Sequence, residues 1–194
     1  GDKRQLTEYG IPEIDLVIVD LYPFEETVSS GAGEQDIIEK IDIGGISLIR
    51  AAAKNFADVL IVPSQKEYLP LLDLLDRNQG ASTEEERKWF ASKAFGVSSH
   101  YDSAIFSWFN QGQEDQQRIS LNDGYVLRYG ENPHQKATFY RFTNSGTPIS
   151  IANATVLQGK ALSYNNMLDS DAAWKSASEA FHAVNGMENR TAVS

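Results

Sequence analysis

The segment Ile41-Asp42-Ile43-Gly44-Gly45 places a carboxylate and two glycines directly before a stretch with helical character. Glycines let the backbone approach a ligand closely, and the first turn of a helix presents unpaired N–H groups at its positive end. Such a turn can hold a phosphate or stabilise a developing oxyanion. The alternative is structural, with Asp42 near the N-cap of the helix. Taken alone, the pattern favours this structural alternative.

A second candidate is Asp20-Leu21-Tyr22-Pro23-Phe24, which follows the aliphatic run 16–19. In open α/β sheets, ligands bind beyond the carboxyl ends of the strands, where Tyr22 could donate a hydrogen bond. The alternative is a tyrosine that packs at the end of a strand. Arg50 and Lys54 are spaced four residues apart on one predicted helix and could meet an anion, although a solvated basic face is commoner.

The second half of the chain contains Arg128 and Tyr129 within the segment 127–135. An arginine can bind phosphate through two hydrogen bonds, and a neighbouring tyrosine can stack or donate. Asn165 and Asn166 precede another predicted helix, where their amides could cap it or hold a ligand.

The three histidines do not have the spacing of a metal site, so no metal is predicted. We interpret them as structural residues. They are His100, His134 and His182.

The elements that must position these residues follow a β-α-β-α order. The aliphatic runs 16–19 and 59–62 are typical of strands covered on both faces, and each is followed by helical stretches. This order indicates an α/β fold with a parallel sheet. Between the two runs, we expect a loop over 25–34 and helices over 35–41 and 46–56. After the second run, we expect helices over 65–78 and 82–109. In the first, Pro70 should cause a kink or a later start of the helix. The second should begin with a capping box at Ser82/Glu85 or Thr83/Glu86, and Gly96 could divide it into two helices.

The composition turns polar and acidic over 111–117, which indicates a domain boundary. We therefore predict one domain over 1–121 and the start of another over 122–194. The second should contain strands over 137–142 and 149–157 and a helix over 170–184.

The composition restricts the partners of the chain. Its 194 residues carry a formal net charge of −10 and include no cysteine. Such an acidic surface disfavours binding to nucleic acid, because it repels the phosphate backbone. No apolar run approaches the roughly 20 residues of a membrane helix. We expect a cytoplasmic protein with no membrane partner. The first residue is glycine and 190–194 reads as the start of a strand, so we also expect both ends to be cut.

Four stretches of the sequence are more specific than these patterns. They are VDLYPFEETV, IEKIDIGGISLIRAAAKN, VLRYGENPHQ and LQGKALSYNNMLDSDAAW. In this order, they resemble landmarks of the bifunctional purine-biosynthesis family, the aminoimidazole-carboxamide-ribotide (AICAR) transformylases/inosine-monophosphate (IMP) cyclohydrolases. The resemblance covers nearly the whole chain. It implies a partial three-layer methylglyoxal-synthase-like domain followed by the start of the α/β transformylase domain.

The resemblance also implies the reactions and the site residues. One domain moves a formyl group from formyltetrahydrofolate to AICAR, and the other closes the formylated product (FAICAR) to IMP without a cofactor. Tyr22, Asp42 and Lys54 match the catalytic residues of the cyclohydrolase. The implied substrate-binding residues of both sites are Val19, Asp20, Gly44, Gly45, Arg128, Tyr129 and Asn166.

Chemistry suggests roles for the catalytic residues. The attacking carboxamide nitrogen is a poor nucleophile, which a carboxylate such as Asp42 can help, and the formyl oxygen gains charge that a lysine, a phenol or backbone N–H groups can stabilise. Lys54 would lie about 14 Å along the helix from Gly45. Many family members have asparagine in place of Asp20, so this acid should contact the sugar or base side of the nucleotide.

The family also has landmarks that this sequence lacks. They are an amino-terminal Ser-Asp-Lys-Thr phosphate loop, a Lys-Thr-Leu-His segment with a catalytic lysine, and the Lys-His pair of the transformylase. We therefore expect a chain that is inactive alone and comes from a homodimeric parent enzyme. Two alternatives are a structural or dimerisation fragment and a nucleotide-binding regulatory module without catalysis.

Overall fold

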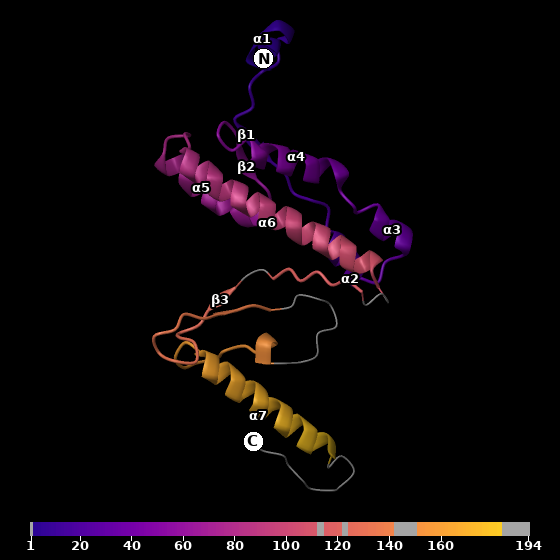
Figure 1. Cartoon of the computed structure of the whole chain (residues 1–194), viewed down its shortest axis with the longest axis vertical. Helices are drawn as coiled ribbons and strands as arrows, with labels where there is room; N and C mark the ends of the chain where they lie inside the picture. The colour runs from indigo at the N-terminus through magenta and orange to yellow at the C-terminus, as the bar shows by residue number, and fades with distance from the viewer. Residues whose placement is uncertain (1, 112–114, 122–123, 142–150, 184–194) are drawn as a thin grey trace. The chain divides into compact units, whose positions relative to one another are not determined.

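The computed structural model describes residues 2–111, 115–121, 124–141 and 151–183 of the chain (Figure 1). The chain divides into two compact units, 1–120 and 121–194, and each is described by itself.

The centre of the first unit is a parallel pair of strands, β1 (Leu16–Ile18) and β2 (Leu60–Val62). Leu16 pairs with Leu60 and Ile18 with Val62. All three residues of β2 are buried, whereas Leu16 and Ile18 of β1 remain partly exposed. The predicted α/β class with a parallel sheet is therefore confirmed.

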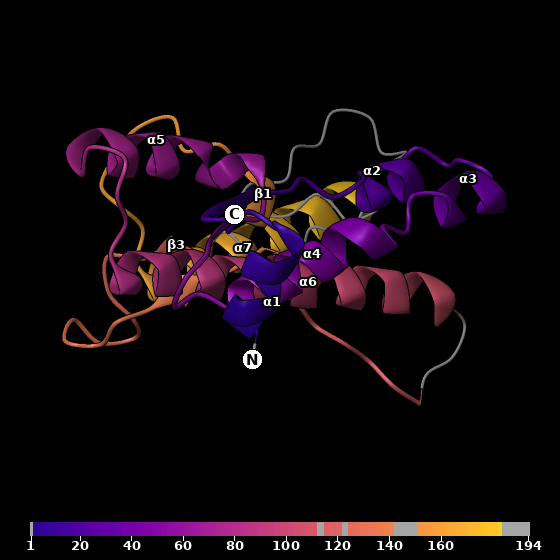
Figure 2. The ribbon, with the colours of Figure 1, turned by 90° about the horizontal axis from the view of Figure 1, so that it is seen from above.

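The helices of the first unit have the bounds α1 Asp2–Tyr9, α2 Phe24–Ser29, α3 Glu34–Ile38, α4 Ile43–Lys54, a 3-10 turn Gln65–Glu67, α5 Tyr68–Arg77 and α6 Glu84–Phe109. Helices α4, α5 and α6 pack against this sheet. Helices α4 and α6 pack along one another, as Figures 1 and 2 show from two directions.

Neighbouring residues of β2 enter two different cores, because successive side chains of a strand point to opposite faces. Ile61 packs with Ile49 of α4 and Ala94 of α6. Leu60 and Val62 enter the other core, whose remaining buried members are Leu71, Leu74 and Phe90.

Four local predictions concerned helices and their boundaries. A helix, α2, forms inside the predicted loop 25–34, because Phe24 is buried against aromatic side chains of α6. The division that Gly96 could have introduced does not occur, since α6 runs without interruption. Pro70 lies in the first turn of α5, where a missing N–H removes no helical bond, and Thr83 with Glu86 forms the capping box of α6.

In its described residues, the second unit contains fewer helices than the first. An antiparallel pair, β3 (Tyr125–Val126) and β4 (Thr138–Phe139), precedes a 3-10 turn, Ile151–Asn153, and the helix α7, Tyr164–Ala183. Of the strand predicted over 137–142, the described residues 137–141 form a strand only at 138–139, and 142 lies outside the described residues. The strand predicted over 149–157 was wrong for the described residues 151–157, because the turn occupies its start; 149–150 lie outside the described residues.

The helix predicted over 170–184 begins earlier, at Tyr164, and residue 184 lies outside the described residues. Within the described residues, no helix combines the length and apolarity needed to cross a membrane.

Candidate functional site

Asp42 is the N-cap of α4. Its Oδ1 accepts a hydrogen bond from the backbone N–H of Gly45 at 2.6 Å. A Cβ atom at position 45 would lie 2.5 Å from Oδ2 of Asp42, whereas one at Gly44 would meet no atom within 4 Å. The structural alternative therefore describes this carboxylate in the present structure. The cap also leaves the backbone around Gly44 open to an approaching group.

The segment before Asp42 is held by α6. The hydroxyl of Tyr101 accepts a hydrogen bond from the Asp42 N–H and donates one to the Lys40 carbonyl, both at 2.7 Å. Tyr101 lies within the predicted helix 82–109, but no local motif indicated that its hydroxyl would contact the Asp42 turn.

Tyr22 lies beside the same segment. The Nζ of Lys40 is 5.8 Å from the centroid of the Tyr22 ring, and Lys40 precedes Asp42 by two residues. The residue is 56% exposed, and no hydrogen bond joins its hydroxyl to any described residue. Tyr22 is therefore exposed rather than packed at the end of a strand, and its ring lies beside the ammonium group of Lys40, two residues before Asp42.

Val19 and Asp20 continue the chain beyond β1. The Val19 N–H donates to the Val62 carbonyl at 3.0 Å, which extends the parallel pairing by one residue. The Asp20 carboxylate accepts a hydrogen bond from the hydroxyl of Tyr68 at the start of α5. This hydrogen bond raises the pKa of Tyr68, because it favours the protonated phenol. Tyr68 is a second neighbour of the predicted site that the sequence did not single out.

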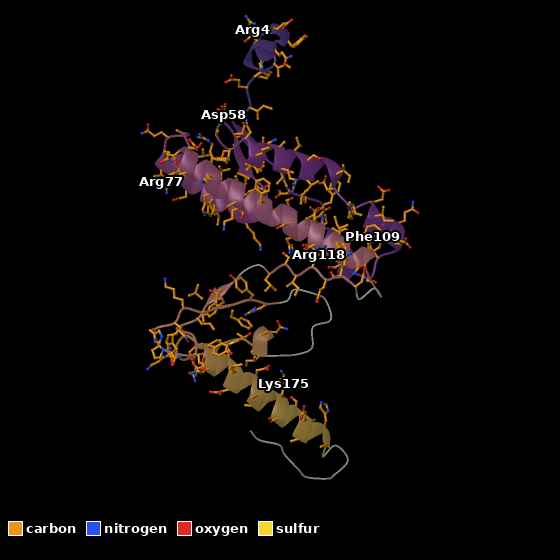
Figure 3. All side chains as sticks on the ribbon, in the orientation of Figure 1. Arg4, Asp58, Arg77, Phe109, Arg118 and Lys175 are labelled. Carbon is orange, nitrogen blue, oxygen red and sulfur yellow. The ribbon has the colours of Figure 1, made fainter. Side chains whose placement is uncertain are left out.

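Lys54 lies in the last turn of α4, about 16 Å along the helix axis from its first residue. A cation is favoured there by the helix dipole. Figure 3 labels Asp58, which follows Lys54 in the chain, at one end of the α4–α6 layer and Phe109 at the other end. Phe24 lies at the Phe109 end, because its ring packs against Trp108. Asp42 caps the first turn of α4, whereas Lys54 lies in its last turn. The structure therefore does not bring Lys54 to Asp42.

Arg50 is directed toward α6 rather than toward Lys54. Its Nη1 donates to the Ser98 hydroxyl at 2.9 Å, and its guanidinium carbon lies 5.8 Å from the Phe95 ring centroid. The two basic residues of α4 consequently do not form a joint anion site.

In the second unit, two backbone hydrogen bonds bring the Arg128-Tyr129 segment beside the start of α7. The Arg128 N–H donates to the Leu162 carbonyl at 2.8 Å, and the Tyr164 N–H donates to the Tyr129 carbonyl at 3.1 Å. The Arg128 guanidinium lies 4.8 Å from the Tyr129 ring centroid, and its Nη2 donates to the Tyr129 hydroxyl at 3.2 Å. This arrangement leaves an exposed cation beside an aromatic ring at a helix N-terminus.

Asn166 belongs to the same cluster but has a structural task. Its Oδ1 accepts hydrogen bonds from the Ser163 N–H at 3.1 Å and from the Ser163 hydroxyl at 3.0 Å. Ser163 in turn accepts the Asn166 N–H, so the pair caps α7. The neighbouring Asn165 donates to the Glu131 carbonyl at 3.1 Å.

No three His, Asp or Glu side chains in the described segments are grouped so as to hold a metal ion. His100 instead contacts Glu25 through Nε2 and Ser120 through Nδ1, both at 2.9 Å. These contacts join α2 and the segment after α6 to α6 itself.

Comparison with known proteins places these residues in context. The sequence model of the family described as "AICARFT/IMPCHase bienzyme" matches residues 52–190. The bifunctional purine biosynthesis protein PurH of Bacteroides thetaiotaomicron is 59% identical over 172 residues, which cover 89% of this chain and 32% of the relative. The protein of the same name from Bradyrhizobium diazoefficiens is 48% identical over 175 residues, covering 88% and 33%.

A solved structure, the crystal structure of ForH, is 34% identical, with a TM-score of 0.46 over 58% of this chain and 59% of that one. The present chain spans about a third of the length of the PurH relatives that it matches.

Proposed function

The chain belongs to the AICARFT/IMPCHase bienzyme family, and on this premise we propose that it is part of a purine-biosynthesis enzyme that formylates AICAR and closes FAICAR to IMP. The observation that carries the proposal is the contact of the Tyr22 ring with the Lys40 ammonium group, two residues before the Asp42 cap of α4. This end of the first unit combines a carboxylate, an exposed phenol and first-turn N–H groups. These are the groups that dehydrative ring closure requires.

The two units would then correspond to the two catalytic domains. Residues 1–121 would form the carboxy-terminal part of a three-layer methylglyoxal-synthase-like cyclohydrolase domain, and 122–194 the start of the transformylase domain. The parallel β1–β2 pair between helices supports the first assignment. Leu16 and Ile18 are partly exposed, which suits a strand that has further neighbours in the parent enzyme.

In the proposed cyclisation, Asp42 accepts a proton from the attacking carboxamide nitrogen of FAICAR. An ionised carboxylate offers about four lone-pair positions, so the hydrogen bond from Gly45 leaves acceptors for the substrate. The Tyr22 hydroxyl and first-turn N–H groups around Gly44 would stabilise the charge that develops on the formyl oxygen. Folding the substrate into position would supply much of the rate, because the reaction is intramolecular. This ring closure needs no cofactor of its own.

Val19, Asp20, Gly44 and Gly45 would line the nucleotide pocket of this site. Lys54 lies about 16 Å from the start of α4, so one small substrate group cannot contact both Lys54 and Asp42. Lys54 can therefore act only from another part of the pocket.

For the second unit, we propose that Arg128 and Tyr129 contact the nucleotide of AICAR, with Asn166 nearby through its cap of α7. The formyl donor would be formyltetrahydrofolate. A cytoplasmic homodimer that binds neither nucleic acid nor membranes completes the proposal. The net charge of −10 supports the exclusion of nucleic acid.

The direct test is a chimera in which this chain replaces the matching third of the Bacteroides thetaiotaomicron relative. Formyl transfer to AICAR and ring closure of FAICAR would be assayed separately, with the unmodified relative as control. We expect both activities in the chimera and neither in the 194-residue chain alone. A soluble chimera without ring closure, beside an active control, would contradict the proposed function of the first unit.

A further inference from the structure

Tyr101 carries a buried hydroxyl at the point where α6 meets the turn before α4. The residue is 7% exposed, and its hydroxyl bridges two backbone groups on either side of residue 41. It accepts from the Asp42 N–H and donates to the Lys40 carbonyl, both at 2.7 Å. One side chain of α6 therefore fixes the backbone on both sides of the Asp42 turn.

The ring of Tyr101 also contacts the segment that carries Tyr22. It packs edge-on against Phe24, with 6.1 Å between ring centroids, and Phe24 packs against Trp108 of the same helix at 6.3 Å. The backbone N–H of Phe24 donates to the Tyr22 carbonyl at 2.8 Å. Movement of the Tyr101 ring would consequently be transmitted to the Tyr22 turn as well as to Asp42.

From this double attachment, we propose that Tyr101 is a positioning residue for ring closure, which holds Asp42 and Tyr22 in a fixed relation. The inference rests on the proposed function of the first unit. Burial raises the pKa of the Tyr101 hydroxyl, so the hydroxyl stays protonated and remains able to donate to Lys40. Removing the hydroxyl would leave the Asp42 N–H and the Lys40 carbonyl without this partner, although the aromatic packing would persist.

The test is Tyr101→Phe in the chimera, because phenylalanine keeps the ring and removes only the hydroxyl. A displacement of about 1 Å in a catalytic group can cost about 100-fold in rate. We expect kcat for ring closure to fall about 10- to 100-fold, with KM changed by less than about threefold, since the substrate contacts themselves remain. Formyl transfer, measured on the same preparation, reports whether the transformylase unit is folded, and the urea midpoint of the 194-residue variant reports on the first unit, which contains Tyr101.

A second measurement uses the 194-residue chain itself. Hydrogen exchange of the Asp42 amide, followed by NMR, should be at least about tenfold faster in Tyr101→Phe than in the unchanged chain, because the amide has lost its acceptor. The matched control is Tyr9→Phe, because Tyr9 is 69% exposed and its hydroxyl makes no hydrogen bond to a described residue. It should change neither exchange nor ring closure.

The outcomes separate the inference from the proposed function. A chimera without ring closure would overturn both. An active chimera in which Tyr101→Phe keeps kcat for ring closure within about twofold would overturn the inference alone. A parallel loss of ring closure and formyl transfer would also overturn it, since Tyr101 would then serve only the fold. Unchanged exchange at Asp42 would show that the hydrogen bond does not hold the turn.

Discussion

The carboxylate of Asp42 lies over Gly45, so that one residue occupies the space in which the side chain of the other would stand. Oδ1 accepts the Gly45 N–H at 2.6 Å, and a Cβ on residue 45 would come within 2.5 Å of Oδ2. Gly44, one residue earlier, has open space at the same position. The two glycines of this turn therefore have different physical reasons to be glycine.

This difference predicts unequal effects of two alanine substitutions. Both Gly44→Ala and Gly45→Ala should gain the helix propensity of alanine, but only Gly45→Ala must displace the Asp42 carboxylate and lose the cap. We expect Gly44→Ala to exceed Gly45→Ala in free energy of unfolding by about 0.5–2 kcal/mol, the usual contribution of an N-cap. Urea unfolding of the two variants measures this difference.

An Asp42→Ala background supplies the control, because it has no carboxylate to displace. The difference between the two alanine variants should disappear there. A difference that persists without the carboxylate would show that the clash does not involve Asp42.

The capping box of α6 predicts a pH dependence of stability. Hydrogen bonds to its carboxylate lower the pKa of Glu86 to about 2, although burial partly opposes this shift. In order of decreasing effect, the donors are the Thr83 backbone N–H, Asn78, the Thr83 hydroxyl and Arg77. A folded pKa below the unfolded value means that the contribution is complete above about 4.5 and is lost as the pH falls toward 2. Urea midpoints between pH 6 and 3 should fall less steeply in Glu86→Gln than in the unchanged chain.

Glu85→Gln is the matched control, since it removes one charge from the same helical turn and leaves the capping box intact. It should follow the pH profile of the unchanged chain. Equal slopes for Glu86→Gln and the unchanged chain would contradict the role given to the Glu86 hydrogen bonds.

The contact between Asp20 and Tyr68 predicts a change in the titration of a phenol. The carboxylate of Asp20 raises the pKa of Tyr68 chiefly by accepting its proton in a hydrogen bond, with its charge adding to the effect. Asp20→Asn removes the charge, so the pKa of Tyr68 should move down toward its usual value of 10.0. NMR of tyrosines labelled at Cζ, with Tyr68→Phe used to assign the signal, measures the shift. An unchanged titration would show that the hydrogen bond does not form in solution.

Much of the scaffold could be predicted because it follows local patterns. The aliphatic runs around Val17 and Ile61 are typical of buried parallel strands, and Thr83 with Glu86 has the spacing of a capping box. The helix α2 could not be predicted in the same way. It depends on the packing of Phe24 against Tyr101 and Trp108, which are more than seventy residues away in the sequence.

The candidate site shows the same division. Asp42 before two glycines was recognisable both as a cap and as a site, and the structure places its carboxylate in the cap. The neighbours that hold its surroundings, Tyr101 and Tyr68, come from distant helices and have no local motif. Sequence spacing also gave no information on whether Arg50 would turn toward Lys54 or toward Ser98, because that choice depends on how α4 packs on α6.

The most direct test of the central claim, that Asp42 is the base of ring closure, is Asp42→Asn in the chimera. Asparagine caps helices about as well as aspartate, so this substitution keeps the fold of the turn and removes the base. A general base typically contributes about 10²- to 10⁴-fold. We predict that kcat for ring closure of FAICAR falls by about 100-fold or more while formyl transfer to AICAR stays near its unsubstituted rate. Ring closure at the unsubstituted rate would contradict the account.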